Sequence, residues 1–249
     1  MPIFDDTEMK SHLPGIGGAN FGFSGTRIEH LGAAEYTLVA IAADVSGSVH
    51  GFKTEIETCI AEIVRACAVS PHSHNLMLRL IAFDSEIEEL HGYKPLPECK
   101  ASAYKGCLDA GGATALYDAS VNAVESITRY GRELSAHGLD VNGIVFVITD
   151  GGDNASTLNM AAVRTALEGA VGAEVVESMV SILVGVNVGS SHTSRALMEL
   201  SAKAGFTRYL ELDQADAATL ARLADFATRS IAAQSIALGS LSPSVSLPF

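Results

Sequence analysis

The stretch "YTLVAIAADVSGSVH", residues 36–50, joins a long apolar run to three oxygen-bearing side chains. The run has the length of a strand and is apolar at successive positions, which is typical of a strand buried on both faces of a parallel sheet. Asp44, Ser46 and Ser48 follow it directly. A carboxylate and hydroxyls are costly to bury without partners. The stretch therefore predicts a central strand whose carboxyl end presents polar groups to water or to a ligand.

Further strand-length runs follow along the chain, and they lie at 76–83, 144–149, 179–186 and 206–212. The first three are mostly apolar, as in strands covered by helices, and the last is more polar and suits a sheet edge. Residues 87–91 follow "FDSE" closely enough for a hairpin, which predicts an antiparallel strand beside the run that ends at Phe83.

Helical patterns separate these runs. Apolar residues recur at helical spacing in 53–69 and 114–130, and further helices fit 157–171, 193–204 and 215–237. Strands that alternate with helices indicate right-handed crossovers. We therefore predict an α/β fold with a doubly wound, mostly parallel, Rossmann-like sheet, one antiparallel edge strand and helices on both faces.

The two ends of the chain lack this regular pattern. "LPGIGGANFGFSG" (13–25) comes near a dinucleotide fingerprint but lacks the third glycine and a preceding strand, so we interpret it as an irregular loop. The last residues, rich in Ser and Pro, have no periodicity. The expected organisation is a Gly-rich arm (1–34), one domain (35–237) and a tail (238–249).

The composition limits the classes of function. The 249 residues are 48% hydrophobic, which is enough for one large core. The formal net charge of −13 makes nucleic acid and anionic membrane surfaces poor partners. The acidic N-terminus does not read as a signal peptide, and no apolar run is long enough to span a membrane. With only four cysteines, these features predict a cytoplasmic protein.

Two other segments place oxygen-bearing side chains near predicted strand ends. "AGGATALYDA" carries Thr114 just before a helix, and "VITDGGDN" carries Asp150 after a strand. Ligands of open α/β sheets bind at the carboxyl ends of strands, near the point where the strand order reverses. We expect Asp44, Ser46, Ser48, Thr114 and Asp150 to share one crevice. Ligands that are all oxygen suit hard cations, with Mg²⁺ first and Mn²⁺ or Ca²⁺ as alternatives.

These three segments resemble the metal-ion-dependent adhesion site (MIDAS) of von Willebrand factor A (vWA) domains. The family pattern is D-x-S-x-S, then a distant Thr and a distant Asp, and the resemblance covers about residues 35–237. One departure is the alanine between the glycines and Thr114. The resemblance implies a Rossmann-like sheet and a divalent ion. It implies direct ligation by the hydroxyls of Ser46, Ser48 and Thr114, with Asp44 and Asp150 bound directly or through water.

The resemblance also sets our expectation of function, which is a non-enzymatic, metal-dependent protein-binding module. A Glu or Asp of a protein partner would complete the coordination sphere. The chain is similar to the bacterial intracellular, stand-alone branch of the family, which implies partners such as AAA+ ATPases, kinases or stress and defence complexes. The alternatives are a structural subunit, including a homo-oligomer, held by its terminal arms, and a Mg²⁺-dependent hydrolase. No G-x-S-x-G, Walker or H-E-x-x-H signature supports an enzyme.

Simpler interpretations apply to each motif taken alone. "DVSGS" is also a turn with a helix N-cap, and "TDGG" is a common turn. Asp153 and Asn154 either support the site indirectly or complete a turn. Asp84 has the same two interpretations, and turn chemistry is favoured. His50 is expected to begin the helix or to face solvent, without acting as a base for the serines.

The remaining metal-binding residue types have weaker patterns. Cys59 and Cys67 fall on the apolar stripe of 53–69 and are expected to be buried thiols. Cys99 and Cys107 lie in a loop, where a disulfide or a zinc site stays open as a minor alternative. The "HSH" sequence at 72–74 favours a solvated loop before a strand over a metal site.

Overall fold

The computed structural model describes residues 9–12, 22–172, 176–189 and 191–212. Within them, eight strands form one sheet in the order β1-β2-β5-β4-β3-β6-β7-β8. The strands are β1 (Met9–His12), β2 (Phe23–Thr26), β3 (Glu35–Asp44), β4 (Leu76–Phe83), β5 (Ile87–Pro95), β6 (Asp140–Thr149), β7 (Ser178–Val186) and β8 (Arg208–Leu212). The helices are α1 (Lys53–Val69), α2 (Leu116–Ala136), α3 (Met160–Gly172) and α4 (Ser191–Ala204).

The central position predicted for the first long strand is confirmed. Strand β3 pairs in parallel with β4 on one side and with β6 on the other. The strand order thus runs in opposite directions on the two sides of β3, and β6, β7 and β8 continue the parallel pairing. The carboxyl ends of β3 and β6 therefore lie side by side at the point where the strand order reverses, which is where open α/β sheets bind ligands.

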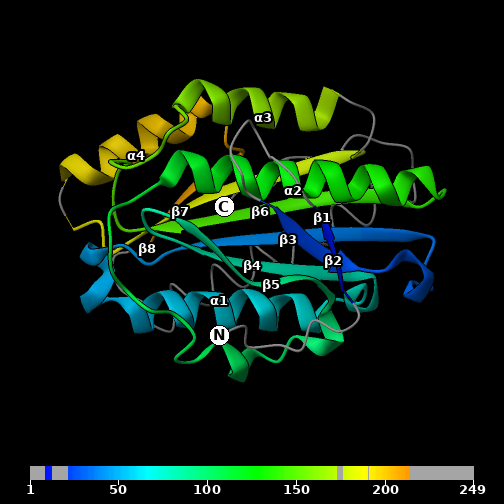
Figure 1. The fold of residues 1–249 in the computed structure, drawn as a ribbon. Helices are drawn as coiled ribbons and strands as arrows, with labels where there is room; N and C mark the ends of the chain where they lie inside the picture. The colour runs from blue at the N-terminus through cyan, green and yellow to red at the C-terminus, as the bar shows by residue number, and fades with distance from the viewer. Residues whose placement is uncertain (1–8, 13–21, 173–175, 190, 213–249) are drawn as a thin grey trace.

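Helices cover both faces of this sheet, with α1 on one side and α2, α3 and α4 on the other (Figure 1). Alternate residues of β3 divide between the two faces, because successive side chains of a strand point in opposite directions. Val39 and Ile41 pack in the core cluster that includes α1, and Leu38 and Ala40 pack in the cluster that includes α2. None of the helices in the described residues is both long and apolar enough to cross a membrane.

The antiparallel strand predicted after Phe83 is confirmed as β5, and it extends beyond 87–91 to Pro95. The segment expected to be an irregular arm contributes two strands. Strand β2 pairs in parallel with β5, and β1 pairs antiparallel with β2, so the sheet continues outside β5. Burial of Phe23 stabilises β2 at this position, because its ring packs edge-to-face against Tyr93 and Tyr130.

The predicted helices at 53–69, 114–130, 157–171 and 193–204 correspond to α1, α2, α3 and α4. The ends of α3 and α4 shift slightly, and α2 continues well beyond residue 130, to Ala136. The start of α2 at Leu116 leaves Thr114 in the preceding loop. The helix predicted at 215–237 and the tail at 238–249 lie outside the described residues.

Candidate functional site

The three predicted segments meet at the carboxyl ends of β3 and β6. Asp44 is the last residue of β3, and Asp150 follows β6 directly. Backbone hydrogen bonds attach the glycine-rich loop that carries Thr114 to the segment after β3. The Gly47 N–H donates to the Gly112 carbonyl at 3.0 Å, and the Gly111 N–H donates to the Val45 carbonyl at 2.7 Å. The topology and these loop contacts therefore bring the segments together.

Side-chain oxygens connect two of these segments. The hydroxyls of Ser46 and Ser48 lie 3.1 Å apart, and the Ser48 hydroxyl donates to Asp150 Oδ1 at 2.9 Å. The Ser46 N–H donates to Asp44 Oδ1 at 2.8 Å. Four of the five predicted residues are thus joined by hydrogen bonds, although Ser48 and Asp150 are 102 positions apart in the chain.

Thr114 joins the group through its backbone. Its N–H donates to Asn154 Oδ1 at 2.6 Å, and the Asn154 N–H donates to the Thr114 carbonyl at 3.0 Å. Neither contact uses the Thr114 hydroxyl. Asn154 therefore does more than complete a turn, because it ties the loop of Thr114 to the loop of Asp150.

Glycine is required at one position of the Thr114 loop. Gly112 has a φ of +73°, and a Cβ atom built there would lie 2.5 Å from Asp84 Oδ2. A left-handed backbone and a close approach both favour glycine. Asp84 itself accepts a hydrogen bond from the Glu86 N–H at 2.9 Å, which agrees with its predicted turn chemistry.

The two carboxylates carry an electrostatic cost. Burial raises the pKa of Asp44, hydrogen bonds from Ser46 and Thr149 oppose that effect, and the nearby charge of Asp150 adds to it. Burial also raises the pKa of Asp150, with the Ser48 hydroxyl as the main opposing contact. Both shifts mean that the ionised carboxylates are under-solvated. A bound cation would offset this cost.

The donor chemistry suits a small hard cation. Mg²⁺ takes oxygen ligands at about 2.1 Å in octahedral geometry, so adjacent ligand oxygens lie about 3 Å apart. The separations from Ser46 to Ser48 and from Ser48 to Asp150 are close to this value. Among the described residues, no group of three or more His, Cys, Asp and Glu could hold a metal. A metal at this site would therefore depend largely on hydroxyl ligands, and the predicted ones are Ser46, Ser48 and Thr114.

Sequence reasoning missed two residues of this region. Thr149 is fully buried, and its hydroxyl donates to Asp44 Oδ2 at 2.6 Å. The signal was a hydroxyl at the end of an otherwise apolar strand, immediately before Asp150. Asp118 is also buried and accepts hydrogen bonds from the N–H groups of Thr157 and Leu158. Its signal was a carboxylate in the first turn of α2.

The other residues of metal-binding type do not form a site in the described part of the chain. All four cysteines are free thiols, so Cys99 and Cys107 form no disulfide. Burial raises the pKa of both Cys59 and Cys67 to about 12, which fits the predicted buried thiols. His72 and His74 belong to no metal-binding cluster of described residues.

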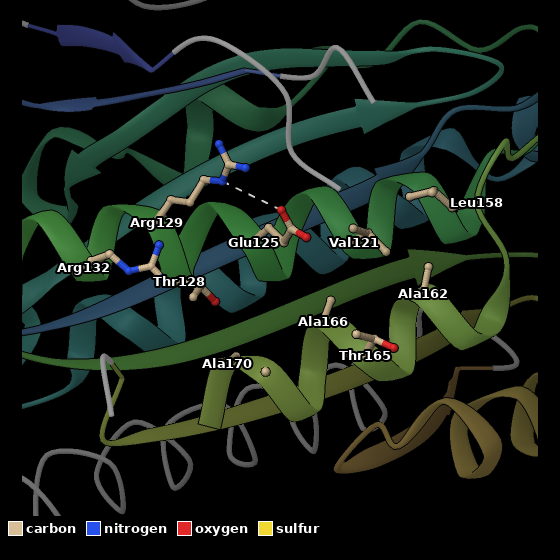
Figure 2. A pocket seen from close by; sticks show the side chains of 11 residues that line it. Val121, Glu125, Thr128, Arg129, Arg132, Leu158, Ala162, Thr165, Ala166 and Ala170 are labelled. Carbon is tan, nitrogen blue, oxygen red and sulfur yellow. Dashed lines mark ion pairs between the residues drawn. The ribbon is translucent and has the colours of Figure 1, made fainter. Parts of the chain in front are cut away.

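A separate groove of about 570 Å³ lies between α2 and α3 (Figure 2). Ala162, Ala166 and Ala170 of α3 line one side, and Arg129 and Arg132 of α2 line the other. None of the five predicted metal-site residues lines it. The groove and the polar cluster at the strand ends are therefore distinct features.

Comparison with known proteins relates the chain to others by fold. No known family matches its sequence, and no curated protein does either. The PilB minor pilin from Streptococcus sanguinis is a similar solved structure, with 13% identity and a TM-score of 0.59 over 86% of this chain and 65% of the pilin. The pilus adhesin SpaC from Lactobacillus rhamnosus GG has 11% identity and a TM-score of 0.53 over 78% of this chain and 30% of the adhesin.

The conserved hypothetical protein BatB from Bacteroides thetaiotaomicron matches over nearly its full length. It has 16% identity and a TM-score of 0.52 over 80% of this chain and 99% of BatB. At these identities the likeness concerns the fold alone. The chain spans about two thirds of the pilin and less than a third of the adhesin.

Proposed function

We propose that this chain is a vWA-type domain that binds a divalent cation, Mg²⁺ first, and uses it to bind an acidic residue of a protein partner. The observation that carries the proposal is the contact of the Ser48 hydroxyl with both Ser46 and Asp150 at the carboxyl end of the sheet. This contact brings together two of the segments whose sequences resemble the MIDAS pattern. The similarity in fold to BatB is compatible with the proposal but does not test the site.

Each residue has a proposed part. The hydroxyls of Ser46, Ser48 and Thr114 would bind the cation directly. Asp44 already accepts two hydrogen bonds, which suits a carboxylate that contributes its charge directly or through water. Asp150 would act likewise. The cation, when bound, supplies a positive charge that can attract a carboxylate from outside.

The charge of the molecule makes such a cation useful. A chain of formal charge −13 repels an acidic partner, and a divalent ion reverses the sign at the point of contact. We propose a partner that offers an exposed Glu or Asp, in the class of AAA+ ATPases, kinases or stress and defence complexes. Assembly through the terminal arms and metal-dependent hydrolysis remain predictions. No contact among the residues that the structure describes favours either of them.

Calorimetric titration with Mg²⁺ and Mn²⁺ tests the metal site directly. The wild type should bind one equivalent, and Asp44→Ala should lose this binding while its circular dichroism spectrum stays unchanged. Asp109→Ala is the matched control, because Asp109 is an exposed carboxylate near the same loop and should bind metal as the wild type does. A wild type that binds neither ion would contradict the proposal.

The partner is tested in a second experiment, a pull-down in Mg²⁺ or in EDTA. The expected partner is retained by the wild type in Mg²⁺ and lost both in EDTA and with Asp44→Ala. Retention that is equal in all three conditions argues against binding through the metal.

A further inference from the structure

The end of β6 and the loop after it contact both of the other segments of the candidate site. Thr149, the last residue of β6, donates to Asp44 Oδ2 at 2.6 Å, and the loop carries Asp150 directly after it. The loop also places Asn154 in a two-way contact with Thr114, which uses the N–H and the carbonyl of Thr114. The end of β6 and this loop therefore supply a candidate ligand together with a contact to each neighbouring segment.

The loop is itself fixed to the start of α2. The Ser156 hydroxyl oxygen accepts from the N–H groups of Tyr117 at 3.0 Å and Asp118 at 3.1 Å. The Asp118 carboxylate accepts from the N–H groups of Thr157 at 3.0 Å and Leu158 at 2.8 Å. These contacts satisfy backbone donors at both ends of the connection, so the protein can hold the loop in place without a cation.

The contact between Thr149 and Asp44 fixes the orientation of a buried carboxylate. Asp44 accepts from the Ser46 N–H through Oδ1 and from Thr149 through Oδ2, so each oxygen has its own donor. A hydrogen bond to a charged group is stronger than one between neutral groups. Without the Thr149 hydroxyl, the buried carboxylate loses this donor and the restraint on its rotation.

We infer that Thr149 and Asn154 are positioning residues of the proposed metal site, an inference that rests on the proposed function. Thr149 orients the carboxylate of Asp44, and Asn154 holds the backbone of Thr114. Neither needs to contact the cation. Groups that orient metal ligands in this way typically change metal affinity by about 10- to 100-fold when they are removed.

The test is Mn²⁺ titration of matched variants by calorimetry and electron paramagnetic resonance. Thr149→Val keeps the shape of the side chain and removes the hydroxyl, so affinity should fall about 10- to 100-fold. Thr149→Ser restores the hydroxyl and should recover most of the affinity. Asn154→Ala should weaken binding, and Asn154→Asp, which keeps the acceptor for the Thr114 N–H, should not.

Asn159→Ala is the control for loss of an asparagine contact elsewhere, because Asn159 accepts from the Ala162 N–H at the start of α3. It should bind Mn²⁺ as the wild type does. Urea unfolding without metal separates a positioning role from a purely structural one. Loss of a purely structural contact would lower the stability of the protein and leave the Mn²⁺ affinity of the folded protein unchanged.

The outcomes are distinguishable. A wild type without Mn²⁺ binding overturns the proposed function itself. A wild type that binds, with Thr149→Val and Asn154→Ala both within twofold of it, overturns the positioning roles alone. If Thr149→Val does not fold, the Mn²⁺ affinity of Asn154→Ala decides between these outcomes, because Asn154 is exposed.

Discussion

At the scale of single residues, the buried imidazole of His91 has two defined partners. His91 is 1% exposed; its Nδ1 lies 2.9 Å from the Gly92 carbonyl and its Nε2 lies 2.9 Å from the Tyr104 hydroxyl. Because a carbonyl can only accept, Nδ1 carries the hydrogen and Nε2 accepts from Tyr104. The environment thus selects one tautomer of the neutral ring.

The neutral state of His91 predicts a pH dependence of stability. Burial, with smaller contributions from Lys94 and Arg79, lowers the pKa of His91 to about 4. The unfolded chain binds this proton near pH 6.5 and the folded protein does not, so stability falls as the pH drops from about 6.5 to about 4, by about 3 kcal/mol at most. Below pH 4 this contribution stays constant.

Urea unfolding between pH 4 and 7.5 measures the effect against His91→Gln. The variant cannot titrate at this position, so the stability advantage of the wild type should shrink as the pH falls. Other titrating groups are common to both proteins and cancel in the difference. Parallel pH curves would show that His91 is protonated equally in both states.

At the scale of elements, an ion pair with a buried cation attaches β2 to the rest of the sheet. Arg79 of β4 is 1% exposed and donates from Nε to Glu89 of β5 at 2.6 Å. Glu89 also accepts from the Ser24 N–H of β2 at 2.9 Å. Arg79 donates further to Asn122 of α2 at 2.8 Å. The Arg79 guanidinium thus connects β4 directly to β5 and to α2. Through Glu89 it is also connected to the added strand β2.

Glu89→Ala should destabilise the protein strongly, because it leaves the buried Arg79 cation without its carboxylate. We expect a loss of about 3 kcal/mol, at the low end for buried pairs since Glu89 stays partly exposed. Chemical denaturation measures it, with Glu88→Ala at the exposed neighbouring position as the control. Arg79→Met combined with Glu89→Met should recover most of the loss. Equal stability of Glu89→Ala and Glu88→Ala would show that the pair contributes little.

At the scale of the whole molecule, the sheet divides the protein into a covered interior and a polar strand-end edge. Helices on both faces remove most apolar strand surface from water, so a ligand can reach the central strands mainly at their ends (Figure 1). The under-solvated carboxylates of Asp44 and Asp150 meet there. The same edge is therefore where a cation would stabilise the folded state as a whole.

Metal addition should raise the unfolding temperature. A ligand at 100 times its Kd stabilises the folded state by about 2.7 kcal/mol, which corresponds to roughly 5–10 °C for a chain of this size. Differential scanning calorimetry with MgCl₂ measures the shift. NaCl at the same ionic strength controls for screening of the net charge, and Ser46→Ala should reduce the shift. An equal effect of both salts would indicate screening without a site.

The local pattern of the sequence was sufficient for most helices and strands. The helix predicted at 53–69 agrees with α1 at both ends, and the strand predicted at 76–83 agrees with β4. Helical and strand periodicities are local properties, so a short window contains them. The four residues of β2 were missed because too few alternating positions are present, and their pairing with β5 involves residues far away in the chain.

The sequence by itself determined that Asp44, Ser46 and Ser48 lie at or just after the end of one buried strand and that Asp150 lies just after another. Only the tertiary structure decided that the Ser48 hydroxyl meets Asp150 and that Thr149 meets the far oxygen of Asp44. The physical reason is that composition and periodicity fix which face of an element is buried. Contacts between side chains depend on strand register and loop path, which are settled only when distant segments pack together.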